Sequence, residues 1–102
     1  MKLAFIGTGK IIADALFAIE PIKEIEKTAI FARPHSKEKA EAFAKQYNIA
    51  EVYTDYEKLL TETAADTVYI GLINSAHYSY AKEALLHRKN VILEKPFTGF
   101  YK

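Results

Sequence analysis

Residues 2–14 of this 102-residue chain read KLAFIGTGKIIAD. A run of four apolar residues, 3–6, leads directly into Gly7-Thr8-Gly9, and apolar residues then recur at helical spacing over 11–19. Two glycines this close together are conformationally expensive unless the backbone turns sharply or a ligand lies against it. The stretch therefore predicts a buried strand, a glycine turn and a helix that ends at Pro21.

The rest of the chain repeats this alternation of short apolar runs and amphipathic segments. The predicted strands are Lys2–Ile6, Thr28–Ala32, Val52–Tyr53, Val68–Leu72 and Val91–Leu93. Such an alternation predicts crossover units with a parallel sheet, and nearly continuous apolar strands are typical of a sheet covered on both faces. We expect an α/β fold of three layers, α/β/α, with a doubly wound parallel sheet in the strand order 3-2-1-4-5.

The later helices have identifiable start signals. Ser36 is a candidate N-cap, and Thr54 with Glu57 fits a capping box for a helix over Asp55–Leu60. A further helix is predicted from about Ser75 to Arg88. The residues expected to face the sheet are Ala40, Phe43, Ala44 and Tyr47 on the second helix, and Ala81, Ala84 and Leu85 on the last one.

Composition excludes several classes of protein. The formal net charge is +1 without a basic stripe or acidic tail, so nucleic acid and membranes are not expected partners. There is no cysteine, and the three histidines are scattered, so no metal site is predicted. The longest apolar run, Val68–Ile73, is too short to span a bilayer. We expect one soluble, cytoplasmic domain over residues 1–102.

On this map the glycine turn joins the first strand to the first helix. Gly7 would permit the tight turn, and Gly9 would let the backbone approach the pyrophosphate of a dinucleotide at the helix N-terminus. The cofactor-binding residues predicted here are Gly7, Thr8, Gly9, Lys10 and Ile11. The third glycine of the dinucleotide fingerprint is replaced by Ile12, so we expect the helix to pack slightly farther from the strand. The alternative is an ordinary glycine turn in an α/β protein.

The segment after the second strand bears on the choice of cofactor. This position normally holds an acid that binds the ribose hydroxyls of NAD, but residues 31–36 contain none. Arg33 instead offers a planar guanidinium suited to a 2′-phosphate, which favours NADP over NAD. His35 and Ser36 are possible assistants, although Ser36 is also explained as a helix cap. A solvated arginine at a strand end is the alternative for Arg33.

Four segments together resemble a known family. They are IGTGKI near the start, Ala32-Arg33 followed by SKEKAEAFAKQY, VYIGLINSAHYSYAKEAL, and VILEKPFT. In this order, over nearly the whole chain, they resemble the N-terminal domain of the glucose–fructose oxidoreductase/inositol dehydrogenase/MocA-like oxidoreductases. The resemblance implies a Rossmann domain followed by a larger α+β domain. It also implies an enzyme that uses NAD or NADP to oxidise or reduce hydroxyls of sugars, cyclitols and related small compounds.

The resemblance also implies roles for individual residues. Lys95 would contact the reacting hydroxyl and assist proton transfer, as the catalytic residue, and would also contact the cofactor. Asn74 and His77 match an Asn-x-x-His near the nicotinamide, Glu94 matches the acid of the Glu-Lys-Pro motif, and Leu72 lies beside them. All five residues are predicted to line the cofactor site.

Further details of the family bear on the backbone. The Lys95–Pro96 bond is a candidate for the cis form, which would aim the lysine back over the strand ends. Two positions depart from the family, because Ile73 stands where a proline is common and Arg88 stands where a glycine is usual near the helix end. These departures bear on the cofactor contacts around the fourth strand.

The resemblance suggests that the chain is a fragment of a longer two-domain enzyme and is inactive alone. Two other interpretations remain, a stand-alone nucleotide-binding or regulatory module, and a Rossmann-type binder of another adenosine cofactor. Residues 91–93 would form an apolar sheet edge, and such an edge promotes pairing with another chain. We therefore expect a homo-oligomer, with a symmetric dimer as the simplest form.

Overall fold

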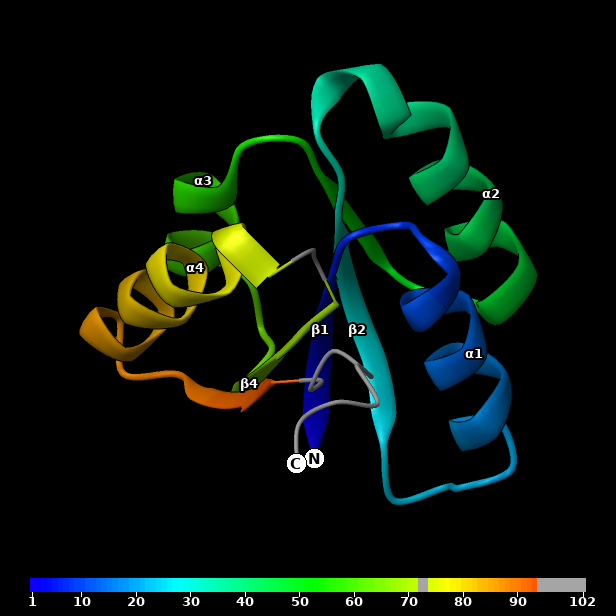
Figure 1. Cartoon of the computed structure of the whole chain (residues 1–102). Helices are drawn as coiled ribbons and strands as arrows, with labels where there is room; N and C mark the ends of the chain where they lie inside the picture. Colours follow the sequence, from blue (N-terminus) through cyan, green and yellow to red (C-terminus); the bar gives the residue numbers. More distant parts are fainter. Residues whose placement is uncertain (72–73, 94–102) are drawn as a thin grey trace, which may run out of the picture.

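The computed structural model describes residues 1–71 and 74–93, and the side chains of residues 1–71 and 78–92. The strands are β1 (Lys2–Ile6), β2 (Glu26–Phe31), β3 (Glu51–Tyr53), β4 (Thr67–Ile70) and β5 (Asn90–Leu93). The helices are α1 (Lys10–Ile19), the 3₁₀ helix η1 (Pro34–Ser36), α2 (Lys37–Tyr47), α3 (Tyr56–Glu62) and α4 (Asn74–Leu86). Strands and helices alternate along the chain, as the sequence predicts (Figure 1).

The five strands form one parallel sheet in the order β3-β2-β1-β4-β5. β1 is the central strand, since it pairs with β2 on one side and with β4 on the other. The predicted fold class and strand order are therefore confirmed. Strand order reverses between β1 and β4, and open α/β sheets bind ligands at the carboxyl ends of the strands at such a point.

Helices cover the sheet on both sides and make three layers. Figure 1 shows α1 and α2 on one face, and α3 and α4 on the other. The buried cluster on the α1 and α2 side contains Leu3, Phe5, Ile12, Leu16, Ile30, Ala32, Ala40 and Ile49. The cluster on the α3 and α4 side contains Ala4, Ile6, Ala29, Phe31, Leu59, Leu60, Ala65, Val68, Ile70 and Ala84. Side chains alternate between the two faces along each strand, so both faces are apolar.

Most predicted boundaries differ from the structure by one or two residues. β1 is as predicted, but β2 begins at Glu26 and ends at Phe31. The predicted capping box before α3 is wrong. Asp55 is the N-cap there, because its carboxylate accepts a hydrogen bond from the amide of Lys58 at 3.2 Å. Aspartate is at least as good an N-cap residue as threonine, and Asp55 lies directly before α3, one residue closer to the helix than Thr54.

The inner face of α4 also differs from the prediction. Ala84 is fully buried and Ala81 packs against the core, but Leu85 is 60% exposed. Tyr80 packs inward, and Tyr78 and Leu86 are exposed. Apolar residues occur on every side of this helix, so periodicity alone does not identify the buried face.

Among the residues that the structure describes, two that are not glycine have the left-handed conformation, and each follows a helix. Asn48 caps α2 with φ 59°, and Arg88, just after α4, has φ 62°. Asparagine tolerates this conformation, whereas for arginine it is strained. Arg88 therefore has a backbone conformation that suits glycine, and the family that the sequence resembles usually has a glycine at this position.

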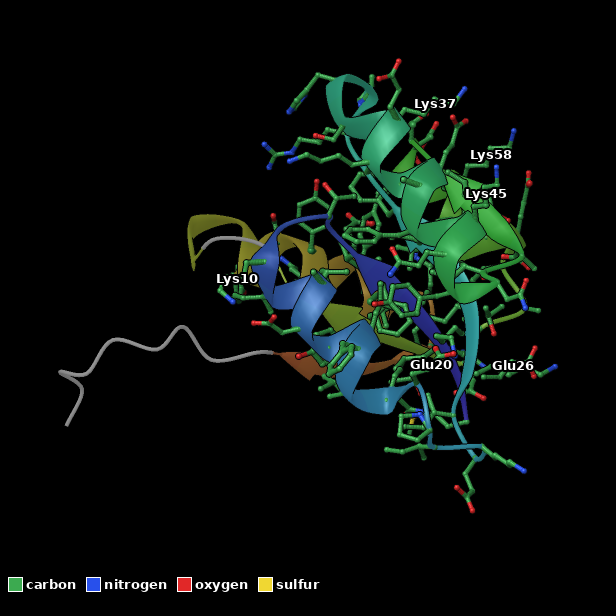
Figure 2. All side chains as sticks on the ribbon, turned by 90° about the vertical axis from the view of Figure 1, so that its right-hand side faces the viewer. Lys10, Glu20, Glu26, Lys37, Lys45 and Lys58 are labelled. Carbon is green, nitrogen blue, oxygen red and sulfur yellow. The ribbon has the colours of Figure 1, made fainter. Side chains whose placement is uncertain are left out.

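Charged side chains cover the outer surface of α2, whereas α1 has charges only at Lys10 and Asp14 and exposes Phe17 (Figure 2). Lys10 pairs with Asp14 at 3.0 Å near the start of α1, and Lys37 pairs with Glu41 at 3.8 Å on α2. In the described part of the chain, the helices are too short or too polar for any of them to traverse a lipid bilayer.

Candidate cofactor-binding site

An open cleft of about 230 Å³ lies at the carboxyl ends of the central strands. The residues that line it come from the last position of β2 and from the segments that follow β1, β2 and β4. They are Gly7, Thr8, Gly9, Phe31, Ala32, Arg33, His35, Ser36 and Gly71. The cleft therefore lies at the reversal of strand order, where the fold class predicts a ligand.

The two glycines of the turn have different reasons to be glycine. Gly7 has φ 120°, a conformation that side chains rarely adopt, and its amide donates to the carbonyl of Phe31 at 2.9 Å. Gly9 has an ordinary φ of −82°, but a β-carbon placed on it would meet no protein atom within 4 Å. Gly7 therefore makes the turn, and Gly9 leaves open space at the cleft. A dinucleotide pyrophosphate fits this cradle because its oxygens need close approach to the backbone.

The N-terminus of α1 faces the same turn. The first hydrogen bond of the helix runs from the amide of Ala13 to the carbonyl of Gly9 at 3.0 Å, so the three preceding helical amides have no acceptor inside the helix. Gly9 caps the helix without a side-chain hydrogen bond, and the first turn contains no acidic residue. The positive end of the helix dipole is therefore not neutralised by a carboxylate of that turn, which favours an anion there.

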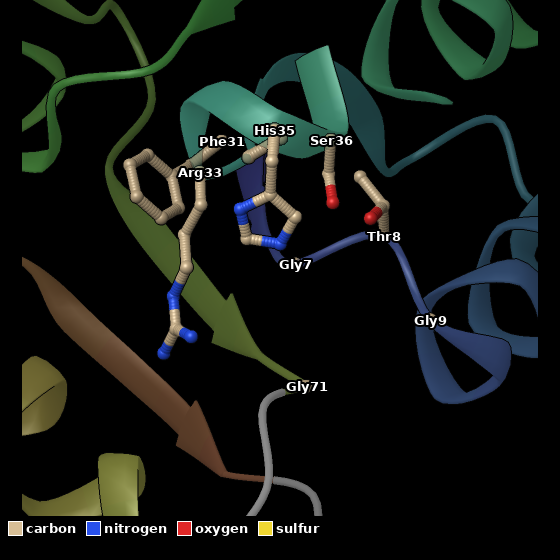
Figure 3. A pocket seen from close by; sticks show the side chains of 9 residues that line it. Gly7, Thr8, Gly9, Phe31, Arg33, His35, Ser36 and Gly71 are labelled. Atoms are coloured by element: carbon tan, nitrogen blue, oxygen red, sulfur yellow. The ribbon is translucent and has the colours of Figure 1, made fainter. Parts of the chain in front are cut away.

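The opposite wall of the cleft is the segment between β2 and α2. Arg33 and His35 are exposed and Ser36 is half-buried. Figure 3 shows their side chains extending toward the side of the cleft that holds Gly7 and Gly71. None of the nine described lining residues carries a carboxylate. This wall therefore presents a guanidinium, an imidazole and a hydroxyl, all of which can donate hydrogen bonds to a phosphate.

The structure changes the interpretation of Ser36. It is the N-cap residue of α2, as predicted, but its side chain makes no capping hydrogen bond. The hydroxyl therefore remains available to a ligand.

The cleft ends on a packed aromatic group. Phe31 is only 4% exposed, and its ring lies 5.5 Å from that of Tyr56 and 5.9 Å from that of Tyr80. The Tyr56 hydroxyl donates to the carbonyl of Tyr80 at 2.8 Å. Burial raises the pKa of Tyr56 well above its usual value, so this hydroxyl remains a neutral donor. Phe31 is thereby fixed in place, and so is the start of the segment that carries Arg33.

The other predicted site residues lie elsewhere. Lys10 and Ile11 do not line the cleft with their side chains, but they belong to the first turn of α1. Asn74 and His77 lie in α4, with side chains outside the described residues.

The remaining predictions concern segments that the structure does not describe. Leu72, Glu94, Lys95 and the Lys95–Pro96 bond are all outside the described residues.

Several lining residues were not among the predicted site residues. They are Phe31, Ala32 and Gly71, together with His35 and Ser36, which were considered only as assistants. The fold itself contains the signal, because the residues that follow neighbouring parallel strands meet at the same edge of the sheet. Gly71 follows β4, directly beside the end of β1, and could have been identified in this way.

Comparison with known proteins agrees with this geometry. Residues 1–100 match the GFO_IDH_MocA family, described as an oxidoreductase family with an NAD-binding Rossmann fold. The chain belongs to this family. The predicted family is thus confirmed, and the chain is its NAD-binding Rossmann domain.

Individual relatives bind either nicotinamide cofactor. The scyllo-inositol 2-dehydrogenase (NADP(+)) of Bacillus subtilis is 33% identical over 99 residues, which are 97% of this chain and 30% of that protein. A 3-ketoreductase from Actinomadura kijaniata in complex with TDP-benzene and NADP has a TM-score of 0.84 at 31% identity, covering 96% of this chain and 30% of that one. An oxidoreductase from Agrobacterium radiobacter in complex with NAD+, L-tartaric acid and magnesium has a TM-score of 0.84 at 26% identity, covering 96% and 28%.

The chain spans about 30% of the length of the curated relatives that it matches.

Proposed function

We propose that this chain is the cofactor-binding domain of an oxidoreductase that acts on a hydroxyl of a sugar, cyclitol or related small compound. When bound, the nicotinamide would supply or accept the hydride. The observation that carries the proposal is the cleft at the reversal of strand order, where Gly7 turns the backbone and Gly9 leaves space beneath the start of α1. Because the chain spans about 30% of its relatives, we assign the substrate contacts to a further domain.

Lys95 remains the proposed proton-transfer residue, on the basis of its match to the family motif. Residue 95 follows shortly after β5, and the carboxyl end of that strand lies at the same edge of the parallel sheet as the cleft. Hydride transfer to or from a carbinol needs a nearby proton donor or acceptor, and a lysine is suited to this role.

We further propose that the domain prefers NADP to NAD. Arg33 lies beside the cleft in the segment that reaches the adenosine ribose in this fold, and the described lining residues provide no acid for the ribose hydroxyls of NAD. A guanidinium can hold a 2′-phosphate through two parallel hydrogen bonds. The relatives named above include users of both cofactors, so the preference depends on the residues of this cleft.

Calorimetric titration of the chain with NADPH and with NADH tests this proposal. NADPH should bind more tightly, and Arg33→Ala should weaken NADPH by roughly 1.5–3 kcal/mol while NADH changes little. Lys37→Ala is the matched control, because it removes a nearby exposed positive charge that does not line the cleft. Equal affinity for the two cofactors would contradict the preference, and failure to bind either would contradict the proposed function.

A further inference from the structure

The third position of the dinucleotide fingerprint holds Ile12, where a glycine normally allows close packing of helix against strand. Ile12 is fully buried in the core on the α1 side of the sheet. Its side chain lies over Gly71, at the end of β4. A β-carbon placed on Gly71 would lie 2.7 Å from Cδ1 and 2.9 Å from Cγ1 of Ile12.

We propose that Gly71 takes over the role of the missing third glycine and sets the position of the anion-binding start of α1. The space that the fingerprint normally provides on the helix is provided here by the residue that directly follows β4. This inference rests on the proposed function, since it concerns the binding of the dinucleotide pyrophosphate.

The backbone at residue 71 cannot easily move to make room for a side chain there. Its amide donates to the carbonyl of Ile6 at 3.0 Å, which ties it to the end of β1. A β-carbon there would also lie 3.2 Å from Cγ2 of Ile11, so the side chains of two successive residues of α1 pack against Gly71. Gly71 does not have a positive φ, so the requirement for glycine comes from space and not from backbone conformation.

A side chain at this position would therefore push on the first turn of α1. Ile12 has no exposed surface into which it could move, because it is enclosed by the core. The strain would pass to the helix start, whose unpaired amides face the glycine turn. Binding that depends on fixed backbone donors is sensitive to small displacements of those donors.

The test compares Gly71→Ala, Ile12→Ala and the double variant I12A/G71A in titrations with NADH and NADPH, with thermal unfolding measured in parallel. Gly71→Ala should weaken both cofactors by the same factor, on the order of 10-fold, because both share the pyrophosphate. The double variant removes Cδ1, Cγ1 and Cγ2 of Ile12 and should restore most of the affinity. Ile12→Ala alone should lower the melting temperature through lost core packing, and its affinity is the reference with which the double variant is compared.

The outcomes are separable. Wild-type affinity in Gly71→Ala, a loss that persists in the double variant, or a loss restricted to NADPH would each overturn this inference while leaving the proposed function intact. A melting temperature that falls while affinity is unchanged would show that the pair serves packing alone, and would also overturn it. A wild-type chain that binds neither cofactor would overturn both proposals.

Discussion

The two loops on either side of the cleft differ in what they offer a ligand. The turn between β1 and α1 offers mainly backbone, since Gly7 and Gly9 have no side chains and the first amides of α1 have no acceptor inside the helix. Thr8 adds one hydroxyl to this turn. The segment between β2 and α2 offers the side chains of Arg33, His35 and Ser36. Backbone suits the pyrophosphate that NAD and NADP share, and side chains suit the ribose position at which they differ. Substitutions in the two loops should therefore have different effects on the two cofactors.

The largest effect shared by both cofactors is expected in the backbone loop, from Gly9→Ala. The added methyl group would occupy the open space at the cleft, so both cofactors should bind roughly 30-fold more weakly, equal to about 2 kcal/mol. The fold should be retained, because φ is ordinary at Gly9 and no protein atom lies within 4 Å. Calorimetric titration gives the affinities and thermal unfolding serves as the control. A loss of affinity confined to NADPH would contradict the assignment of the backbone loop to the pyrophosphate that both cofactors share.

An intermediate effect is expected in the side-chain loop, from Ser36→Ala. NADPH should bind about fivefold more weakly, since one hydrogen bond is worth about 1 kcal/mol, and NADH should not change. Stability should change by less than about 0.5 kcal/mol, because Ser36 makes no capping hydrogen bond. Asp55→Ala is the matched control. It removes a cap bond that does form, so it should cost about 1 kcal/mol of stability without changing cofactor affinity.

A smaller effect, on stability alone, is expected from Arg88→Gly. Glycine relieves the strain of a left-handed arginine but adds freedom to the unfolded chain, so a net gain of about 0.5–1 kcal/mol is expected. Asn48→Gly should gain less, because asparagine already tolerates this conformation. Denaturant unfolding measures both. Unchanged affinities for NADH and NADPH in Arg88→Gly would show that stability can change without affecting either loop.

The fold was largely predictable from local patterns. Short apolar runs, helical spacing and glycine or proline at the boundaries are properties of a few neighbouring residues, and general rules then determine the strand order. Such patterns do not predict burial where a residue's neighbours in the fold are distant in sequence. Leu85 has helical spacing with Ala81, but apolar residues occur on every side of α4, and only the assembled core shows which side is buried.

The candidate site shows the same division. Gly7, Gly9 and Arg33 belong to short motifs that indicate their place beside the cleft. Gly71 was missed because its importance depends on Ile12, which is distant in sequence and adjacent only in the folded chain. The surroundings of Ile12 are equally non-local, because its side chain lies over Gly71, which follows another strand.

The central position of β1 has a consequence for how the domain folds. β1 precedes the other four strands along the sequence, yet its partner on one side is β4, with Ile6 paired to Ile70. That edge of β1 stays unpaired until most of the chain is available, and closing so long a loop costs entropy before the contact forms. We expect β1, α1 and β2 to assemble first and β4 to dock late. Folding should therefore be slow compared with a helical bundle of the same length.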